Sequence, residues 1–313
     1  MKTILRTFVG CTAILFGTAC MGAVKYVPEN MKVELSLKVP GNNAVNYKLH
    51  PDKLENSYFD YEWRSDNKLP ITVFHKVEER DSCMRLTVQL TAAQDVYFNY
   101  RQLLSTGYRH DNCQFYMPGF WYRRNLRSPK KAPSFHTSDS WLVREDRLSA
   151  PLTGIFSEKE KRFMTVNRLD DFSMDALATH KEGEIILSGK TSLGFTGFEN
   201  QQGIAMLSFG FPYREAPKSY IRKLTLAPEV EAFQLMKKGE SVLLTWEIME
   251  SGADDFSDFI QHTWEHCYDT YAPKPVENSY SIADMKQVLS CFFVNSLVDN
   301  QPLVYNSGIH LKV

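Results

Sequence analysis

The sequence has no marked excess of charge of either sign. Thirty-six basic residues nearly balance 37 acidic residues, which leaves a net charge of −1. A protein without a positive field has no long-range attraction for nucleic acid or for an anionic membrane surface. We therefore expect no nucleic-acid partner.

Several motifs of known catalytic and metal centres are also missing. The chain contains no Cys-x-x-Cys pair, no glycine-rich phosphate loop and no Gly-x-Ser-x-Gly elbow. His262 and His266 have the spacing of a zinc-protease helix, but Thr263 stands where the glutamate of that motif belongs. We therefore expect no metal and no cofactor.

Long apolar runs are confined to the first residues. Lys2 and Arg6 precede an apolar stretch over residues 8–19, and small residues follow up to Ala23. This layout is typical of a secretory signal peptide, and the stretch is shorter than the roughly 20 residues of a membrane span. We expect residues 1–23 to be a signal peptide and the protein to be periplasmic or associated with the outer membrane.

The mode of processing stays open between two routes. Cleavage after Ala23 gives a protein without a lipid, whereas Thr18-Ala19-Cys20 resembles the end of a lipoprotein signal and makes Cys20 a candidate lipid anchor. The cysteines that follow are Cys83, Cys113, Cys267 and Cys291. Four cysteines allow two disulfides in three connectivities, so the sequence leaves their pairing open. Cys267 and Cys291 lie on the two predicted helices, and we expect them to be buried thiols.

Alternation of apolar and polar residues dominates the middle of the chain. Apolar residues from Met31 to Val39 alternate with charged or polar ones, as in a strand with one face in water. Further strands are predicted over residues 58–64, 71–78, 84–90, 96–101, 113–117, 151–156, 162–168, 184–188, 203–211, 220–226, 230–236 and 241–249. So many strands predict a mainly β fold, a large antiparallel β-sandwich of the supersandwich kind over residues 24–252.

Helical patterns begin only after the predicted sandwich. A helix is predicted to begin in Ser251–Asp254 and to end at Ala272–Pro275, because proline cannot continue it. It forms, with the proline break, a linker over residues 253–280. Ser281 and Asp284 are spaced as a capping box, which predicts the start of a helical domain over residues 281–313.

Aromatic and basic residues gather around the turn signal Pro118-Gly119. Flat apolar rings stack on sugar rings, and arginine donates forked hydrogen bonds to hydroxyls or uronic carboxylates. The alternative is a strand end with buried rings and solvated arginines. The candidate saccharide-binding residues are Tyr116, Phe120, Trp121, Tyr122, Arg123, Arg124 and His136.

Paired carboxylates follow at Glu145 and Asp146. Glycoside hydrolysis needs two converging carboxyl groups, but adjacent residues of a strand point to opposite faces. We therefore predict that both are surface charges paired with Arg144 and Arg147. The catalytic residues stay unassigned.

Two segments, Phe115–Arg127 and Ser134–Trp141, resemble a known family. The predicted order of sandwich, helix and proline break along the chain resembles it as well. They are similar to the N-terminal region of exported glycoside hydrolases and related polysaccharide-degrading enzymes of gut Bacteroidetes. In those enzymes a large β-sandwich precedes an (α/α) toroid, which carries the catalytic carboxylates. The resemblance implies a carbohydrate partner and a chain that holds only the first toroid helix and is inactive by itself.

Two other readings remain beside this resemblance. The chain is then either a non-catalytic β-sandwich that binds glycan or an envelope-associated structural protein. The amphipathic pattern after Ser281 favours the enzyme, because a toroid needs that helix and a binding module does not. The sugar, the linkage, hydrolase or lyase chemistry and the oligomeric state stay open.

The predicted leader is tested by expression in a bacterium with two membranes. We expect a processed protein outside the cytoplasm, and mass spectrometry should find Val24 or a lipidated Cys20 as its first residue. Leu15→Arg combined with Phe16→Arg breaks the apolar run and should leave the unprocessed chain inside. Leu15→Ile with Phe16→Leu keeps the run apolar and is the matched control. Export of the arginine variant would contradict the prediction.

Overall fold

The computed structural model describes residues 27–80, 83–125, 134–170, 182–221, 225–227, 229–274 and 281–295. The chain divides into two compact units, one up to Thr263 and one from Trp264 onward, and each is taken by itself. The predicted signal peptide and Cys20 lie outside the described residues. Among the described residues, no helix combines the length and the apolar character needed to cross a membrane.

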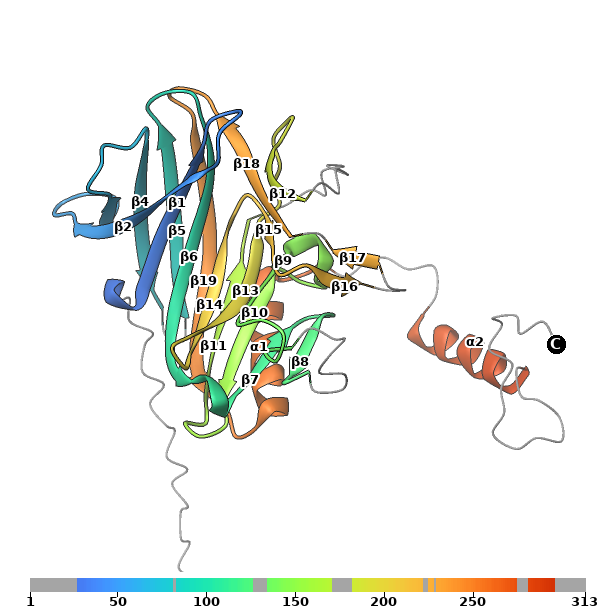
Figure 1. Ribbon diagram of the computed structural model, residues 1–313. Coiled ribbons are helices and arrows are strands. Elements are labelled where there is room, and N and C mark those ends of the chain that lie inside the picture. The colour runs from blue at the N-terminus through green and yellow to red at the C-terminus, as the bar shows by residue number, and fades with distance from the viewer. Residues whose placement is uncertain are drawn as a thin grey trace, which may run out of the picture. The chain divides into compact units, whose positions relative to one another are not determined.

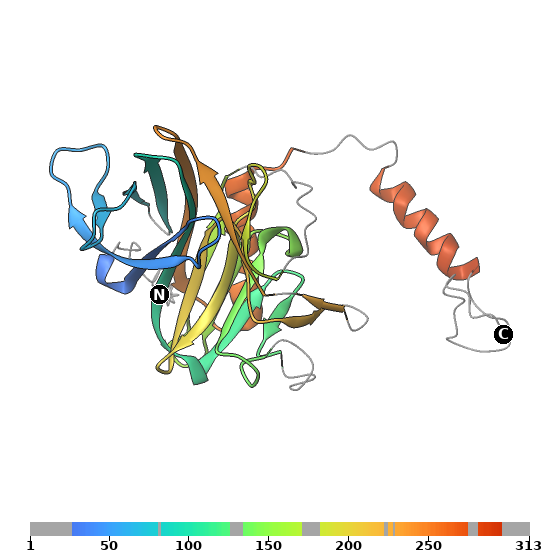
Figure 2. The same ribbon diagram turned by 45° about the horizontal axis from the view of Figure 1, so that its top comes forward.

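The first unit is built on one continuous sheet of 17 strands that folds over into two facing layers (Figures 1 and 2). The layers are joined by β2, whose residues 45–49 pair with β1 and whose residues 50–53 pair with β3. The first layer runs in the order β2 (Val45–Lys53), β1 (Met31–Lys38), β6 (Val96–Arg109), β14 (Ile204–Phe211), β13 (Phe195–Gln201) and β9 (Ser140–Arg144). The second layer runs in the order β3 (Tyr61–Arg64), β4 (Ile71–Glu79), β5 (Cys83–Ala92), β19 (Ser241–Gly252), β11 (Arg162–Arg168), β10 (Leu152–Ser157), β7 (Cys113–Met117) and β8 (Trp121–Arg123).

Short strands extend the first layer at one end of β6. β18 (Val230–Met236) pairs with β6 and also with β12 (Gly183–Ile186) and β15 (Arg214–Glu215). Its pairing with β12 is parallel, and the other strand pairs of the described residues are antiparallel. A separate hairpin is formed by β16 (Ser219–Ile221) and β17 (Thr225–Ala227). The predicted mainly β, antiparallel fold is thereby confirmed.

The core lies between the two layers, where the inward side chains of both meet. The alternation in the sequence reflects this arrangement, since Met84, Leu86 and Val88 of β5 are buried, with Arg85 and Thr87 between them. The core also holds His75, whose Nε2 lies 2.8 Å from the hydroxyl of Tyr100. Burial lowers the pKa of His75 to about 3, so the ring is neutral at physiological pH.

Some elements differ from the sequence-based expectation. β2, β9 and β13 were not predicted: β2 is largely exposed and polar, and β13 is buried on both faces, so neither alternates. The range 220–226, predicted as one strand, falls on two strands, because β16 ends at Ile221 and β17 begins at Thr225. The helix α1 (Phe256–Tyr271) begins later than predicted, because Ser251 and Gly252 still pair with β11. Asp255 then accepts hydrogen bonds from the N–H groups of residues 257 and 258, which caps the helix.

The first turns of α1, up to Thr263, pack on the outer face of the second layer. The ring of Phe259 lies 4.9 Å from that of Phe163 and 6.1 Å from that of Phe156. Gly154 makes this approach feasible, because a Cβ there would lie 2.6 Å from the Phe259 ring. The start of the predicted linker helix is thus part of the sandwich unit.

The second unit contains the end of α1 and the helix α2 (Ile282–Asn295). The capping box is confirmed, since Ser281 Oγ accepts the N–H of Asp284 at 3.1 Å and Asp284 accepts that of Ser281 at 3.1 Å. Cys267 is buried as expected, whereas Cys291 is exposed, which corrects its prediction as a buried thiol. In the first unit, Cys83 and Cys113 are free thiols and form no disulfide.

A buried ion pair joins the two layers. Arg168 at the end of β11 donates from Nη1 to Glu145 Oε2 over 2.7 Å, and the same oxygen accepts the N–H of Gly194 at 2.7 Å. Glu145 follows β9 in the other layer, as the first residue of the 3₁₀ helix η3 (Glu145–Arg147), and it is 1% exposed. The prediction of Glu145 as a surface charge is therefore wrong. Asp146 does pair with Arg144, as expected.

Removing one partner of this pair should destabilise the fold strongly. Arg168→Met leaves the Glu145 carboxylate buried without its cation, and we expect a loss of about 3–5 kcal/mol in the free energy of unfolding. Arg168→Met combined with Glu145→Met should recover part of that loss, as measured by urea unfolding. Arg162→Met removes an exposed ion pair of the same strand and should cost at most about 1 kcal/mol. Equal losses for the two single variants would refute the structural role.

Candidate functional site

The hairpin of β7 and β8 carries most of the predicted saccharide-binding residues. Its turn is closed by the N–H of Phe120, which donates to the carbonyl of Met117 at 3.0 Å. Gly119 has a φ of +84°, which fits the third position of a type II turn after proline. The turn predicted from Pro118-Gly119 is confirmed.

The rings of this hairpin are mostly buried. Trp121 is fully buried in the core, and its Nε1 donates to the carbonyl of Arg123 at 3.0 Å. Tyr116 is buried on the other face, with its ring 6.1 Å from that of Phe259. Phe120 packs against the core and is only partly buried. Tyr116 and Trp121 therefore cannot stack on a ligand in this fold, and the alternative of buried rings applies to them.

Tyr122 and Arg123 are exposed, and each contacts a neighbouring part of the hairpin or of α1. The Tyr122 hydroxyl accepts the N–H of Gly119 at 3.1 Å. The Arg123 guanidinium lies over the Phe256 ring, 5.3 Å from its centre. Both side chains thus serve the hairpin and its contact with α1.

Arg124 and His136 are brought together in a pocket of about 380 Å³, which we call the loop pocket. Its size is within the range of small-molecule sites. It lies where the 3₁₀ helix η2 (His110–Asn112), β7, the end of β13 and the segment before β9 meet. The further lining residues are His110, Asp111, Cys113, Phe115, Phe135, Asp139 and Asn200.

Sequence reasoning missed His110, Asp111 and Asn200 as site residues. His110 and Asp111 belong to a short polar loop without a motif, and Asn200 lies in the unpredicted strand β13. Only the pairing of β13 with β9 brings Asn200 beside residues 134–139. No local signal in the sequence indicates that pairing.

The floor of the loop pocket is aromatic. The His110 ring lies 4.2 Å from that of Phe135 and 5.0 Å from that of Phe115. Beneath them, the ring of Phe115 packs 4.9 Å from Phe198. Phe135 remains partly exposed, so the floor offers an apolar ring surface fixed by the core.

The polar rim is held by hydrogen bonds to neighbouring backbone. Arg124 Nη2 donates to the carbonyl of Asp111 at 2.8 Å, and its guanidinium pairs with Glu158 at 3.6 Å. Asn200 Nδ2 donates to Asp139 Oδ1 at 3.1 Å, and the Asn200 N–H donates to the Asp139 carbonyl at 2.7 Å. These bonds orient donors and acceptors before any ligand arrives.

The segment Ser134–Ser140, which we call the ridge, is fixed from below by Trp141. The indole N–H lies 3.2 Å from the carbonyl of Ser134 and 3.1 Å from that of Ser138. Thr137 adds bonds from its N–H and hydroxyl to the Ser134 carbonyl, at 3.0 and 2.8 Å. The position of His136 is thus set by a buried tryptophan.

His110 is the electrostatically unusual group of the loop pocket. Burial lowers its pKa, which outweighs the opposite effect of the nearby Asp111 and Asp139 carboxylates. Its Nε2 is buried and has no hydrogen-bond partner in the part of the chain that the structure describes. A neutral imidazole with an unused ring nitrogen can donate to or accept from a hydroxyl group.

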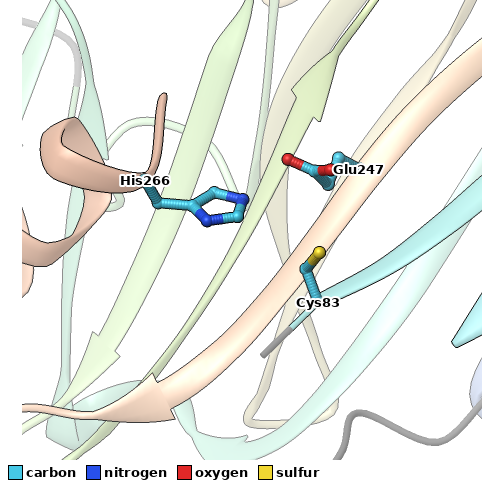
Figure 3. Close-up of side chains that lie close together, drawn as sticks. All are labelled: Cys83, Glu247 and His266. Atoms are coloured by element: carbon cyan, nitrogen blue, oxygen red, sulfur yellow. The ribbon is translucent and has the colours of Figure 1, made fainter. Parts of the chain in front are cut away.

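The first unit also brings a thiol and a carboxylate together, away from the loop pocket. Figure 3 shows Cys83 of β5 beside Glu247 of β19. Burial, with the Glu247 carboxylate second, raises the pKa of the Cys83 thiol to about 11. Metals bind the thiolate, so a raised pKa opposes binding, and two ligands are fewer than a zinc site uses. His266, also drawn there, belongs to the second unit.

Comparison with known proteins gives only distant similarity. No family model matches the chain, and no curated protein matches it. Among solved structures, a polysaccharide lyase is similar over 75% of this chain and 27% of its own, with 13% identity and a TM-score of 0.35. This chain thus spans about a quarter of the length of that lyase.

Two smaller structures show similarity of the same order. A galactose mutarotase related enzyme from Lactobacillus acidophilus is 8% identical, with coverage of 71% of this chain and 80% of its own and a TM-score of 0.36. A galactose mutarotase-like protein from Clostridium acetobutylicum is 9% identical, with coverage of 69% and 65% and a TM-score of 0.32. These values are too low to transfer an activity to this chain.

The state of His110 can be measured directly. We expect its imidazole signals to titrate with a midpoint below the ordinary histidine value of about 6.5, because the charged form loses hydration. Two-dimensional NMR with ¹⁵N-labelled histidine gives the midpoint, and His110→Gln assigns the signal. Phe135→Ala should bring the midpoint back toward 6.5 by admitting water. A midpoint at or above that value in the unaltered protein would contradict the buried neutral ring.

Proposed function

We propose that this chain is the sandwich portion of an exported protein that acts on polysaccharide or oligosaccharide, and that the loop pocket binds a sugar unit. The carrying observation is the combination of the partly exposed Phe135 ring with the unused Nε2 of His110 in a pocket lined by fixed polar groups. The resemblance to exported Bacteroidetes enzymes supports the same class of ligand.

The chemistry of a sugar explains why this combination fits. One face of a sugar ring presents C–H groups, which pack on an aromatic ring, and its edge presents hydroxyls. Hydroxyls both donate and accept, so they need donors such as Arg124 together with acceptors such as Asp139. Asn200 and neutral His110 supply both roles.

Catalysis belongs, in this proposal, to a helical toroid whose first helix is α2. The second candidate is a glycan-binding protein without catalysis. It is favoured by the buried carboxylates of the first unit, since Glu145 is engaged with Arg168 and Glu215 with Arg147. Burial raises the pKa of both carboxyl groups, but each is engaged in an ion pair and is therefore not free to exchange a proton with a substrate.

The binding test uses the whole exported protein and a panel of plant and host oligosaccharides. We expect calorimetry to show binding of at least one sugar and His136→Ala to weaken it roughly tenfold, because one contact to a hydroxyl is worth about 1.4 kcal/mol. Arg124→Ala should weaken it similarly. Lys68→Ala, an exposed residue outside the pocket, is the control and should bind normally.

Reducing-sugar release in the same samples tests whether the sandwich itself is catalytic. Binding without release agrees with catalysis in a toroid or with a binding protein, whereas release lost on changing a loop-pocket residue would place catalysis in the sandwich. Binding that is unaffected in both pocket variants would refute the loop pocket as the site.

A further inference from the structure

A second pocket lies on the other side of the ridge. It has a volume of about 540 Å³, and we call it the charged pocket. Ser138 and Ser140 of the ridge line the charged pocket, whereas His136 and Asp139 line the loop pocket. The backbone of residues 138–140 separates the two pockets, because Asp139 lines the loop pocket whereas its two neighbours line the charged pocket.

The charged pocket has a rigid polar wall. Arg214 donates from Nε to Asn99 Oδ1 at 2.7 Å and from Nη2 to Ser36 Oγ at 2.9 Å. Asn99 and Ser36 are fully buried on the outward side of β6 and β1. Buried polar groups oppose folding unless each is hydrogen-bonded. Here Asn99 and Ser36 accept hydrogen bonds from the Arg214 guanidinium and thereby set its orientation.

The balance of charge in the charged pocket argues against an anionic ligand. Five glutamates and two arginines line it. Both arginines are already paired, Arg214 with Glu231 at 2.6 Å and Arg101 with Glu34 at 3.3 Å. Four of the five glutamates are paired as well, with Lys38, Arg147, Arg214 and Lys218. A uronic acid or sulfate therefore finds no unpaired arginine among these lining residues, whereas an uncharged sugar finds both donors and acceptors.

The loop pocket has the same character. Asp111 and Asp139 outnumber Arg124 there, and His110 is neutral at physiological pH because its pKa is lowered. Neither pocket therefore favours a negative ligand. Both offer paired hydrogen-bonding groups to hydroxyls.

We propose that the two pockets are successive subsites for one uncharged oligosaccharide that crosses the ridge. This inference rests on the proposed function, since it takes the loop pocket as the first sugar site. Joined subsites raise affinity only for ligands long enough to occupy both. Affinity must then rise with chain length and depend little on salt, because no charge of the ligand is screened.

The experiment compares neutral oligosaccharides of increasing length in calorimetry on the whole protein. The series is the one whose short members bind the loop pocket, and a uronic-acid series of the same lengths runs beside it. We expect the longer neutral members to bind roughly tenfold or more tighter than the shortest ones. Raising the salt concentration should leave their Kd unchanged, and the uronic series should bind more weakly.

Ser140→Tyr fills the charged pocket from the ridge, at a strand position where tyrosine is well tolerated. This variant should remove the increase in affinity with oligosaccharide length and leave the Kd of the shortest sugars unchanged. Thr72→Tyr, at an exposed position of β4, is the matched control and should keep the gain. Glu229→Gln, on the wall of the charged pocket, should reduce the gain without altering the strands.

Each outcome bears on a different statement. A gain with length that survives in Ser140→Tyr overturns the second subsite, as does equal or tighter binding of the uronic series. Binding of short sugars with no gain from length also overturns it, while the proposed function stands. Absence of any saccharide binding overturns the proposed function and the inference together.

Discussion

The buried ion pair between Arg168 and Glu145 joins the two layers of the sandwich at the end of β9, the strand that follows the ridge. Arg168 ends a strand of one layer, and Glu145 follows the edge strand β9 of the other. The pair also holds the N–H of Gly194, just before β13. A charge taken out of water must be compensated on the spot, so these three segments have one arrangement in which they can pack.

The position of the ridge depends on this ion pair. β9 is held at its end by Glu145 and along its length by β13, and its Trp141 indole bonds two carbonyls of the ridge. The polar groups of both pockets therefore stand on the ridge and on strand and loop residues around it, which a rigid core supports from below. Loops set on a packed scaffold are where binding groups commonly occur, because only there can polar side chains reach solvent without leaving the backbone unbonded.

The candidate site was foreseen in part, and the physical reason can be read from individual residues. The aromatic and basic composition after β7 drew attention to the segment that holds Arg124, and Arg124 and His136 line one pocket. The same composition could not tell that Trp121 and Tyr116 point away from solvent, because a ring that stacks on sugar and a ring that fills a core look alike in sequence. Glu145 was misjudged for a similar reason, since its cation is 23 positions further along the chain.

The sequence by itself determined the elements whose signals are local. Alternation specified β1, β4 and β5, proline and glycine specified the β7–β8 turn, and Ser281 with Asp284 specified the start of α2. These depend on neighbours a few residues apart. The tertiary structure alone decided which strands pair, that β2 passes from one layer to the other, and that His110, Asn200 and His136 line one pocket. Such contacts join residues far apart in the chain, and their free energy comes from burial and pairing that exist only once both layers have closed.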